Sequence, residues 1–72
     1  MRISELARLT GVSARSIRHY EAKGLLQAVR LENNYREFDE SAVPRIKAIQ
    51  LYLRLGLTTD EIRDLFEGEV AP

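Results

Sequence analysis

The stretch "ARSIRHYE" gathers two arginines, a serine, the only histidine of the chain and a tyrosine within eight positions. Arg15 and Arg18 are three residues apart, so on a helix they lie on the same side, with His19 nearby. The rigid fork of an arginine can grip a guanine edge or a phosphate through two parallel hydrogen bonds. Ile17 and Tyr20 point the other way, toward a core. The pattern predicts an amphipathic helix with a cationic outer face, although the same arginines could merely solubilise a surface helix.

His19 has no partners for catalysis or for metal binding. The chain contains no cysteine and no second histidine, so it offers no thiolate or imidazole set for a metal. No nucleophile or oriented carboxylate stands beside His19 to complete a catalytic set. We therefore predict that the protein is not an enzyme and uses no cofactor and no metal. His19 itself is expected to be a groove-facing donor or simply an exposed residue.

The length of 72 residues allows one small domain. Residues 1–38 carry seven Lys and Arg against four acids, and residues 39–72 carry four against seven, so the halves have charges of +3 and −3. This asymmetry favours an anionic partner for the basic half, or reflects chance clustering on a solvated surface. No apolar block is long enough for a signal peptide or a membrane span, so we expect a cytoplasmic protein without a membrane partner.

Capping residues mark the first two predicted helices. A serine precedes and a glycine follows each one: Ser4 and Gly11 bracket residues 5–10, and Ser13 and Gly24 bracket residues 14–23. The connector between them is short and contains glycine, which is the helix-turn-helix arrangement. Val12 in this connector is expected to turn into the core, and Leu6 and Leu9 to share the inner face of the first helix.

The stretch "LLQAVRLENNYREF" predicts a β-hairpin with its turn at Asn33-Asn34, because asparagine tolerates the positive φ of tight turns. With a two-residue turn, the expected cross-strand pairs are Leu31 with Arg36, Arg30 with Glu37, and Val29 with Phe38. That register places the apolar side chains on one face of the hairpin and an opposite-charge pair on the other.

Two further helices follow the hairpin. Ser41 is expected to start the third helix, which leaves Pro44 in the first turn, where proline is tolerated. This helix is apolar on two sides, as the central helix of a core is, and Gly56 ends it. Thr58 and Glu61 predict a capping box at the start of the fourth helix. The inner face of that last helix is expected to comprise Ile62, Leu65 and Phe66.

Three separated motifs, "ISELARLTGVSARSIRHYEAKGLL", "NNYREFDESAV" and "LGLTTDEIRDLF", resemble in order and spacing the N-terminal DNA-binding domain of the MerR family of bacterial transcription regulators. The resemblance covers residues 2 to about 67. It implies a mainly α winged helix-turn-helix fold with four short helices and a small β-hairpin wing. The single domain, residues 1–72, would then comprise a helix-turn-helix plus wing (3–38), a supporting helix pair (39–67) and a tail (68–72).

The resemblance also assigns DNA-binding roles to nine residues. In the recognition helix they are Ser13, Arg15, Ser16, Arg18, His19 and Tyr20, and in the wing they are Asn34, Tyr35 and Arg36. The helix residues would meet bases and phosphates, whereas the wing residues would grip the phosphate backbone and supply affinity. Tyr20 would contact the backbone, buttress the helix, or pack in the core with a tethered hydroxyl. Asn34 stands where the family usually has glycine.

The implied partner is double-stranded DNA with a pseudo-palindromic operator in the bacterial nucleoid, and RNA polymerase at the promoter is implied for the full-length regulator. Family members usually continue into a long dimerisation helix and an effector-sensing domain. A homodimer is therefore expected only with a C-terminal dimerisation helix, which we do not find in these 72 residues, and we expect an excised domain rather than a naturally short protein. Leu51, Tyr52 and Leu55 add more apolar surface than this core needs, which favours the excised domain.

Two other functions stay open on the sequence alone. An excisionase-like architectural protein would share the winged helix, and DNA bending without promoter regulation would identify it. A protein-interaction module of the same fold would use the acidic second half, including Asp60, Glu61 and Asp64. Binding to a protein without measurable affinity for DNA would identify that module.

Overall fold

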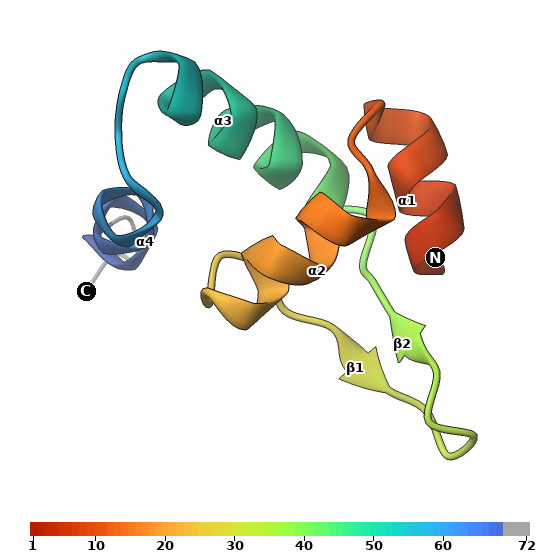
Figure 1. Cartoon of the computed structure of the whole chain (residues 1–72). Helices are drawn as coiled ribbons and strands as arrows, with labels where there is room; N and C mark the ends of the chain where they lie inside the picture. Colours follow the sequence, from red (N-terminus) through yellow and green to blue (C-terminus); the bar gives the residue numbers. More distant parts are fainter. Residues whose placement is uncertain (69–72) are drawn as a thin grey trace.

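Four helices and one two-stranded hairpin make up the computed structural model, which describes residues 1–68 (Figure 1). The elements are α1 (Ile3–Thr10), α2 (Ala14–Ala22), β1 (Val29–Arg30), β2 (Arg36–Glu37), α3 (Ala42–Arg54) and α4 (Thr59–Gly68). In Figure 1, α1 and α2 lie toward the N-terminal end of α3, α4 lies beyond the C-terminal end of α3, and the hairpin projects away from the helices. The predicted mainly α winged helix-turn-helix fold is confirmed.

The turn between α1 and α2 follows the prediction. Gly11 takes the left-handed conformation at φ 72°, and its N–H donates to the Ala7 carbonyl at the end of α1. Ser13 caps α2, because its Oγ accepts a hydrogen bond from the Ser16 N–H at 3.1 Å. Val12 between them is buried. The connector therefore anchors both helices to the core and sets the direction in which α2 leaves it.

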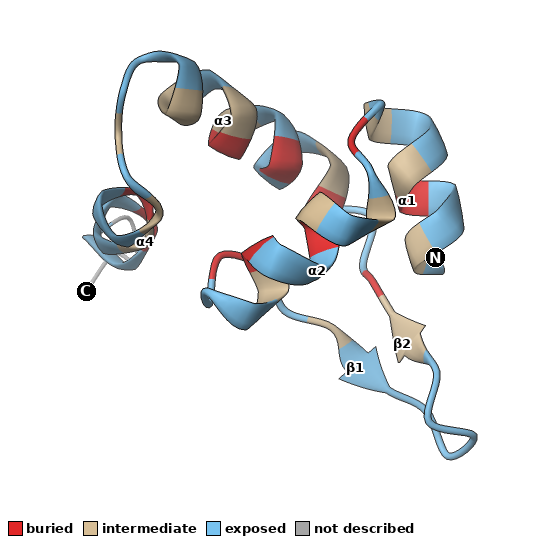
Figure 2. Cartoon of the chain, viewed as in Figure 1, coloured by how far each residue is buried: buried red, intermediate tan, exposed pale blue. Residues whose placement is uncertain are grey.

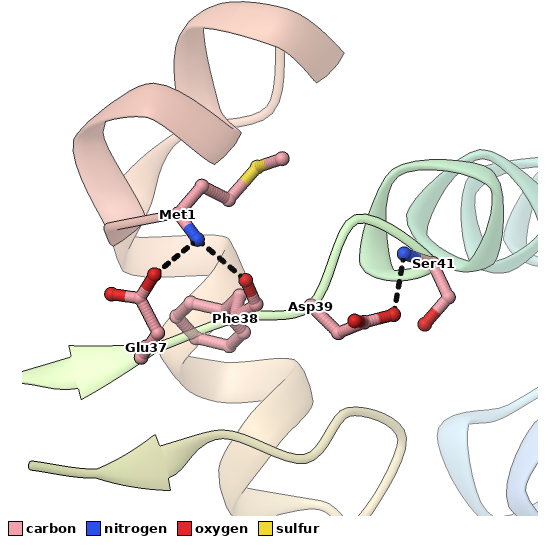
Figure 3. Close-up of polar contacts among 5 residues, drawn as sticks. All are labelled: Met1, Glu37, Phe38, Asp39 and Ser41. Carbon is pink, nitrogen blue, oxygen red and sulfur yellow. Dashed lines mark hydrogen bonds and ion pairs between the residues drawn. The ribbon is translucent and has the colours of Figure 1, made fainter.

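Helix α1 begins at Ile3, two residues before the predicted start, and Ser4 is not its cap. Arg2 precedes the first turn in an extended conformation, with φ −81° and ψ 162°. The cause is a contact that is distant in the sequence: the Met1 amino group donates to the Phe38 carbonyl at 2.6 Å (Figure 3), and the Phe38 N–H donates to the Met1 carbonyl at 2.7 Å. This backbone pairing holds the first residue beside the end of the hairpin, so the helix starts soon after it.

The wing, residues 29–37, pairs one residue out of the predicted register. Val29 lies opposite Glu37, and Arg30 lies opposite Arg36, so the pairing of Val29 with Phe38 is wrong. The predicted pair of opposite charges, Arg30 with Glu37, is likewise replaced by two arginines facing each other across the strands. Like charges in directly opposite positions destabilise a strand pair, so this register leaves positive charge to be balanced by other groups.

The length of the loop explains the shifted register. The Leu31 N–H donates to the Tyr35 carbonyl at 2.9 Å, which closes a loop of three residues rather than two. Within it, Asn34 is the non-glycine residue with positive φ, 66°, as in a type I turn followed by a left-handed residue. A shift of one residue turns side chains to the opposite face. Val29 and Leu31 are accordingly exposed.

Helix α3 begins at Ala42, directly after Ser41 as predicted, with Pro44 in its first turn. The cap differs, because the Ser41 side chain makes no capping hydrogen bond and the Asp39 carboxylate accepts the Ser41 N–H at 2.9 Å (Figure 3). Hydrogen bonding from the side chain and then the backbone of Ser41 lowers the pKa of the Asp39 carboxyl. Gly56, at φ 93°, follows the end of the helix as predicted.

Thr58 and Glu61 form the predicted capping box of α4. The Thr58 N–H donates to Glu61 Oε1 at 2.8 Å, and the Glu61 N–H donates to Thr58 Oγ1 at 3.1 Å. The helix buries Ile62 and Phe66 but leaves Leu65 44% exposed, so the placement of Leu65 on the inner face is wrong. The helix continues to Gly68, and the rest of the predicted tail, residues 69–72, lies outside the described residues.

The core joins the four helices to the base of the wing (Figure 2). Its buried side chains are Leu6, Val12, Ile17, Tyr20, Leu25, Leu26, Phe38, Ala42, Ile46, Ile49, Ile62 and Phe66. Phe38 follows β2 and anchors the wing, since burying such a side chain contributes about 1.5–3 kcal/mol. Leu9 is exposed, contrary to the prediction. Leu51 and Leu55 are exposed, as expected for surplus apolar surface, whereas Tyr52 packs half-buried against the core.

Candidate DNA-binding surface

Helix α2 presents Arg15 and Arg18 to solvent and buries Ile17 and Tyr20, as the sequence pattern predicts. His19 is exposed beside Arg18. Within residues 1–68, neither arginine forms an ion pair with an acidic side chain. Both guanidinium groups are therefore available to a phosphate or a base edge, and the buried side of the helix holds them in position.

Ser13 and Ser16 bond to each other at the start of α2. Ser13 Oγ donates to Ser16 Oγ at 3.1 Å while it accepts the Ser16 N–H. Ser13 is exposed and Ser16 is half-buried. Because the two hydroxyls share one hydrogen bond, one hydroxyl proton of the pair remains free to donate to a ligand.

Tyr20 supports the recognition helix from inside the protein. Its side chain is 5% exposed, and its hydroxyl accepts a hydrogen bond from Gln50 Nε2 of α3 at 2.6 Å. Of the roles left open by the sequence, this geometry favours core packing with a tethered hydroxyl. A direct contact between Tyr20 and the DNA backbone stays a prediction.

Replacing Tyr20 by phenylalanine separates these roles. Tyr20→Phe is expected to lower the unfolding free energy by about 1 kcal/mol, because the half-buried Gln50 amide loses its partner. DNA affinity of the folded variant should stay within about twofold of the parent, since a buried hydroxyl has no reach to DNA. Urea unfolding and a DNA titration measure the two effects. An affinity loss of about tenfold in a fully folded variant would instead mean that the hydroxyl contributes to DNA binding, by direct contact or by holding α2 in position.

Two contacts tie the wing to the helix-turn-helix. Tyr35 is 53% exposed, and the Arg2 guanidinium lies 3.9 Å from the centre of its ring in a cation–π contact. Arg36 Nε lies 2.8 Å from Glu21 Oε1 of α2. The two groups form an ion pair, but the geometry at Nε does not meet that of a hydrogen bond. The wing is thus attached to the segment before α1 through one arginine and to α2 through another.

The start of α1, the outer side of α2 and the wing enclose a shallow hollow of about 180 Å³, which we call the arginine hollow. Its lining residues are Arg2, Ile3, Arg18, Arg30, Asn34, Tyr35 and Arg36. Arg30 Nη1 lies 3.3 Å from both the carbonyl oxygen and the side-chain oxygen of Asn34, to which it donates. Arginines clustered on one face of a helix-turn-helix are the electrostatic footprint of nucleic-acid binding.

Arg2 and Arg30 belong to this surface although the sequence motifs do not assign them a role. Arg2 precedes the first predicted helix. The predicted register placed Arg30 opposite Glu37, so it did not indicate that Arg30 lies near the other arginines. The excess of positive charge in residues 1–38 could have pointed to them, because both are among the seven Lys and Arg of that segment. The structure brings both beside Arg18 and Arg36, which the sequence did assign.

Two other features, a membrane-spanning helix and a metal-binding cluster, were sought in residues 1–68. Within residues 1–68, no helix has the length and apolar character to cross a membrane. In the described part of the chain, no group of three His, Cys, Asp or Glu residues is arranged to hold a metal ion.

The outward arginines of α2 and the wing beside it define a winged helix-turn-helix DNA-binding domain. Residues 1–69 match the family model described as MerR HTH family regulatory protein. This match spans nearly the whole chain, and the protein belongs to the MerR family. The resemblance found in the sequence is therefore confirmed.

Curated relatives agree with this assignment. The chain is 43% identical over 68 residues to nodulation protein NolA of Bradyrhizobium elkanii, covering 93% of this chain and 31% of that protein. It is 40% identical over 68 residues to the HTH-type transcriptional regulator CueR of Bacillus subtilis, covering 94% and 48% of the two chains. It is 35% identical over 72 residues to the HTH-type transcriptional regulator ZntR of Escherichia coli, covering 99% and 51%.

The chain spans between about three tenths and one half of the length of these relatives. CueR and ZntR are HTH-type transcriptional regulators, and this chain is a MerR-family DNA-binding domain. This assignment favours the regulator over the excisionase-like protein and the protein-interaction module.

Proposed function

We propose that α2 enters the major groove of operator DNA with its N-terminal residues nearest the base edges. Arg15 and Arg18 would make the contacts that set sequence preference, because an arginine fork matches the two acceptors of guanine. Ser16 and His19 would add hydrogen bonds from the same side of the helix. The observation that carries this proposal is the outward, unpaired position of both arginines on a helix whose opposite side is buried.

The wing would lie on the phosphate backbone beside that groove. Tyr35 and Arg36 supply a hydroxyl and a guanidinium, which are common phosphate donors. Asn34 shapes the tip of the wing through its positive φ and accepts the Arg30 guanidinium. Contacts of this kind fix the register of a protein on DNA and add affinity, whereas they carry little sequence information.

Replacing Arg36 tests the role of the wing. Arg36→Gln is expected to reduce the slope of log affinity against log salt by about 0.9, the value for one phosphate contact, with base preference kept. Arg54→Gln is the matched control, because Arg54 ends α3 and does not line the arginine hollow. DNA titrations at several salt concentrations give both slopes. An unchanged slope combined with an altered base preference would mean that the wing reads sequence.

The complete regulator would act as a homodimer on a pseudo-palindromic operator in the bacterial cytoplasm. Each half-site would receive one copy of this domain, and a C-terminal dimerisation helix would join the copies. RNA polymerase at the promoter would be its partner in regulation. The exposed Leu51 and Leu55 support this proposal, because they offer apolar surface that a further segment would cover.

Selection of DNA sites from random duplexes tests the proposal directly. The domain should enrich one half-site sequence, and its affinity for that site should exceed its affinity for scrambled DNA at the same salt concentration. Enrichment must depend on Arg15 and Arg18 for the proposal to hold. A domain that binds all duplexes equally, at every salt concentration, would not be the reading element of an operator.

A further inference from the structure

We propose that the α-amino group of Met1 is a modification site: it anchors the wing only as a free ammonium, and an Nα-formyl or Nα-acetyl group releases that anchor. Acylation converts the ammonium to a neutral amide, so it removes the terminal charge. The effect on DNA binding rests on the proposed function, in which the wing lies on the phosphate backbone. The anchor itself rests on the contacts of residue 1.

The amino group of Met1 is held between a side chain and the backbone at the end of β2 (Figure 3). Its nitrogen lies 2.6 Å from Glu37 Oε1 and 2.6 Å from the Phe38 carbonyl oxygen, and it donates a hydrogen bond to each. The Phe38 N–H donates in return to the Met1 carbonyl at 2.7 Å. Residue 1 therefore pairs with the end of the wing through two backbone hydrogen bonds, and the ammonium supplies one of them.

An ammonium can satisfy both acceptors, whereas an acylated nitrogen cannot. The ammonium carries three N–H donors and a positive charge, but the acylated nitrogen carries one N–H donor and no charge. Either the Glu37 carboxylate or the Phe38 carbonyl would lose its donor, and the acyl oxygen would add another acceptor at the same place. Within residues 1–68, the Met1 ammonium is the only ion-pair partner of Glu37, so acylation removes the counter-charge of this carboxylate.

Partial burial strengthens the ion pair between Met1 and Glu37. The Met1 side chain is 14% exposed and the Glu37 side chain 42%, whereas Arg8 and Glu5 of the pair on α1 are 68% and 46% exposed. Hydrogen bonds between charged groups are stronger than neutral ones, and salt screens a partly buried pair less than an exposed pair. Loss of the Met1 ammonium is therefore a larger change than loss of a surface ion pair.

Release of Met1 would also release the next residue. The Arg2 guanidinium lies 3.9 Å from the centre of the Tyr35 ring, so two neighbouring residues hold the wing from the same side. A Met1 that leaves β2 displaces Arg2 with it. Val29 and Leu31 are exposed, so they add little buried surface to hold the strands in place. Acylation should therefore loosen the wing more than it loosens the helices.

A formyl group on Met1 would have to be removed by hydrolysis before the anchor can form. Hydrolysis breaks the bond between the formyl carbon and the nitrogen, and water supplies a hydroxyl to the carbon and a hydrogen to the nitrogen. The released formic acid gives up a proton, and the amine takes up a proton to become the ammonium. A deformylating hydrolase is thus the class of enzyme that would supply the anchored form.

Four synthetic forms of the 72-residue chain test the anchor: a free amino terminus, Nα-formyl, Nα-acetyl and Nα-methyl. The methyl form is the matched control, because it stays charged and keeps two N–H donors for Glu37 and Phe38. We expect the formyl and acetyl forms to melt about 4 °C or more below the free form, and the methyl form to melt close to it. Equal melting temperatures in all four forms would overturn the proposal, and so would a methyl form that melts as low as the acetyl form.

Amide hydrogen exchange shows whether the wing itself is released. The Leu31 N–H donates to the Tyr35 carbonyl in the wing, and the Leu57 N–H donates to the Tyr52 carbonyl after α3. Acetylation should speed exchange at Leu31 by about tenfold and leave exchange at Leu57 nearly unchanged, because the wing opens locally. Equal acceleration at both amides would show general destabilisation and overturn the proposal.

A titration with a duplex of random sequence tests the effect on DNA binding. Acetylated Glu37→Gln has the same net charge as the unmodified parent, because it has lost one charge of each sign. It should nevertheless bind about fivefold more weakly than the parent at the same salt concentration, since its wing is released. Equal affinities would overturn the link to DNA binding. The proposed function fails separately, if Arg15 and Arg18 prove irrelevant to site preference, so the two failures can be told apart.

Discussion

Replacing Arg15 and Arg18 together by alanine is expected to abolish preference for an operator and to weaken binding by about 100-fold or more. One bidentate contact from arginine to a base contributes about 1–3 kcal/mol of discrimination, and about 1.4 kcal/mol corresponds to tenfold in affinity. Both side chains are exposed and form no ion pair within residues 1–68, so their removal leaves the core and the helix cap intact. DNA titration with a selected site and a scrambled site measures the loss.

The single variants show which contact each arginine makes. A base-reading arginine relaxes discrimination at one position of the site, whereas a phosphate-binding arginine weakens all sequences about equally. Arg54→Ala is the matched control, because it removes an arginine from the end of α3 and should leave binding unchanged. If the double variant keeps the affinity and the site preference of the parent, α2 is not the recognition helix.

Features that depend on neighbouring residues were predictable from the sequence. The Ser13 cap and the capping box of Thr58 and Glu61 join residues three positions apart, so the sequence contains both partners of each hydrogen bond. Gly11 likewise ends α1 through its own backbone conformation. The helix boundaries set by these local contacts agree with the prediction.

The errors lie where distant contacts decide the structure. Helix α1 starts at Ile3 because Met1 pairs with Phe38, a contact between residues 37 positions apart. The wing register depends on whether one or both asparagines of the turn take positive φ, and only Asn34 does. Asparagine favours a turn equally in a two-residue and in a three-residue loop. The sequence alone therefore could not decide between these two loop lengths.

The contrast between local and distant contacts also separates the predicted residues of the site from the missed ones. The arginines of α2 follow a helical period, so their shared side is readable from spacing alone. Arg2 and Arg30 come together only through the folding of the wing onto the start of α1. For Leu9 and Leu65 the helical spacing was misleading. Their spacing matches that of the buried residues of their helices, yet each side chain is more than 40% exposed, because no neighbouring element covers it within residues 1–68.

A polypeptide of residues 1–72 is expected to sediment as a monomer and to bind a symmetric operator weakly. The two half-sites lie about 34 Å apart, one turn of the duplex, and each needs its own recognition helix. Helix α4, Thr59–Gly68, is about 15 Å long at the usual rise per residue, and it already buries Ile62 and Phe66 in its own core. Two separate copies would therefore bind independently.

Joining two copies in one chain should raise the affinity for a symmetric operator by about 100-fold, because the second binding step becomes intramolecular. A Gly/Ser linker of about 40 residues has an average end-to-end distance near the required span of about 34 Å. The matched control carries Arg15→Ala and Arg18→Ala in one copy only and should bind like a single domain. Sedimentation and DNA titration measure assembly and affinity together. A stable dimer of the 72-residue chain would mean that residues 1–72 already contain the dimer interface, whereas equal affinities for the single domain, which sediments as a monomer, and the joined domains would mean that the two copies do not engage both half-sites together. A gain of about 100-fold would instead come entirely from effective concentration, because each copy in the joined protein makes the same DNA contacts as the single domain.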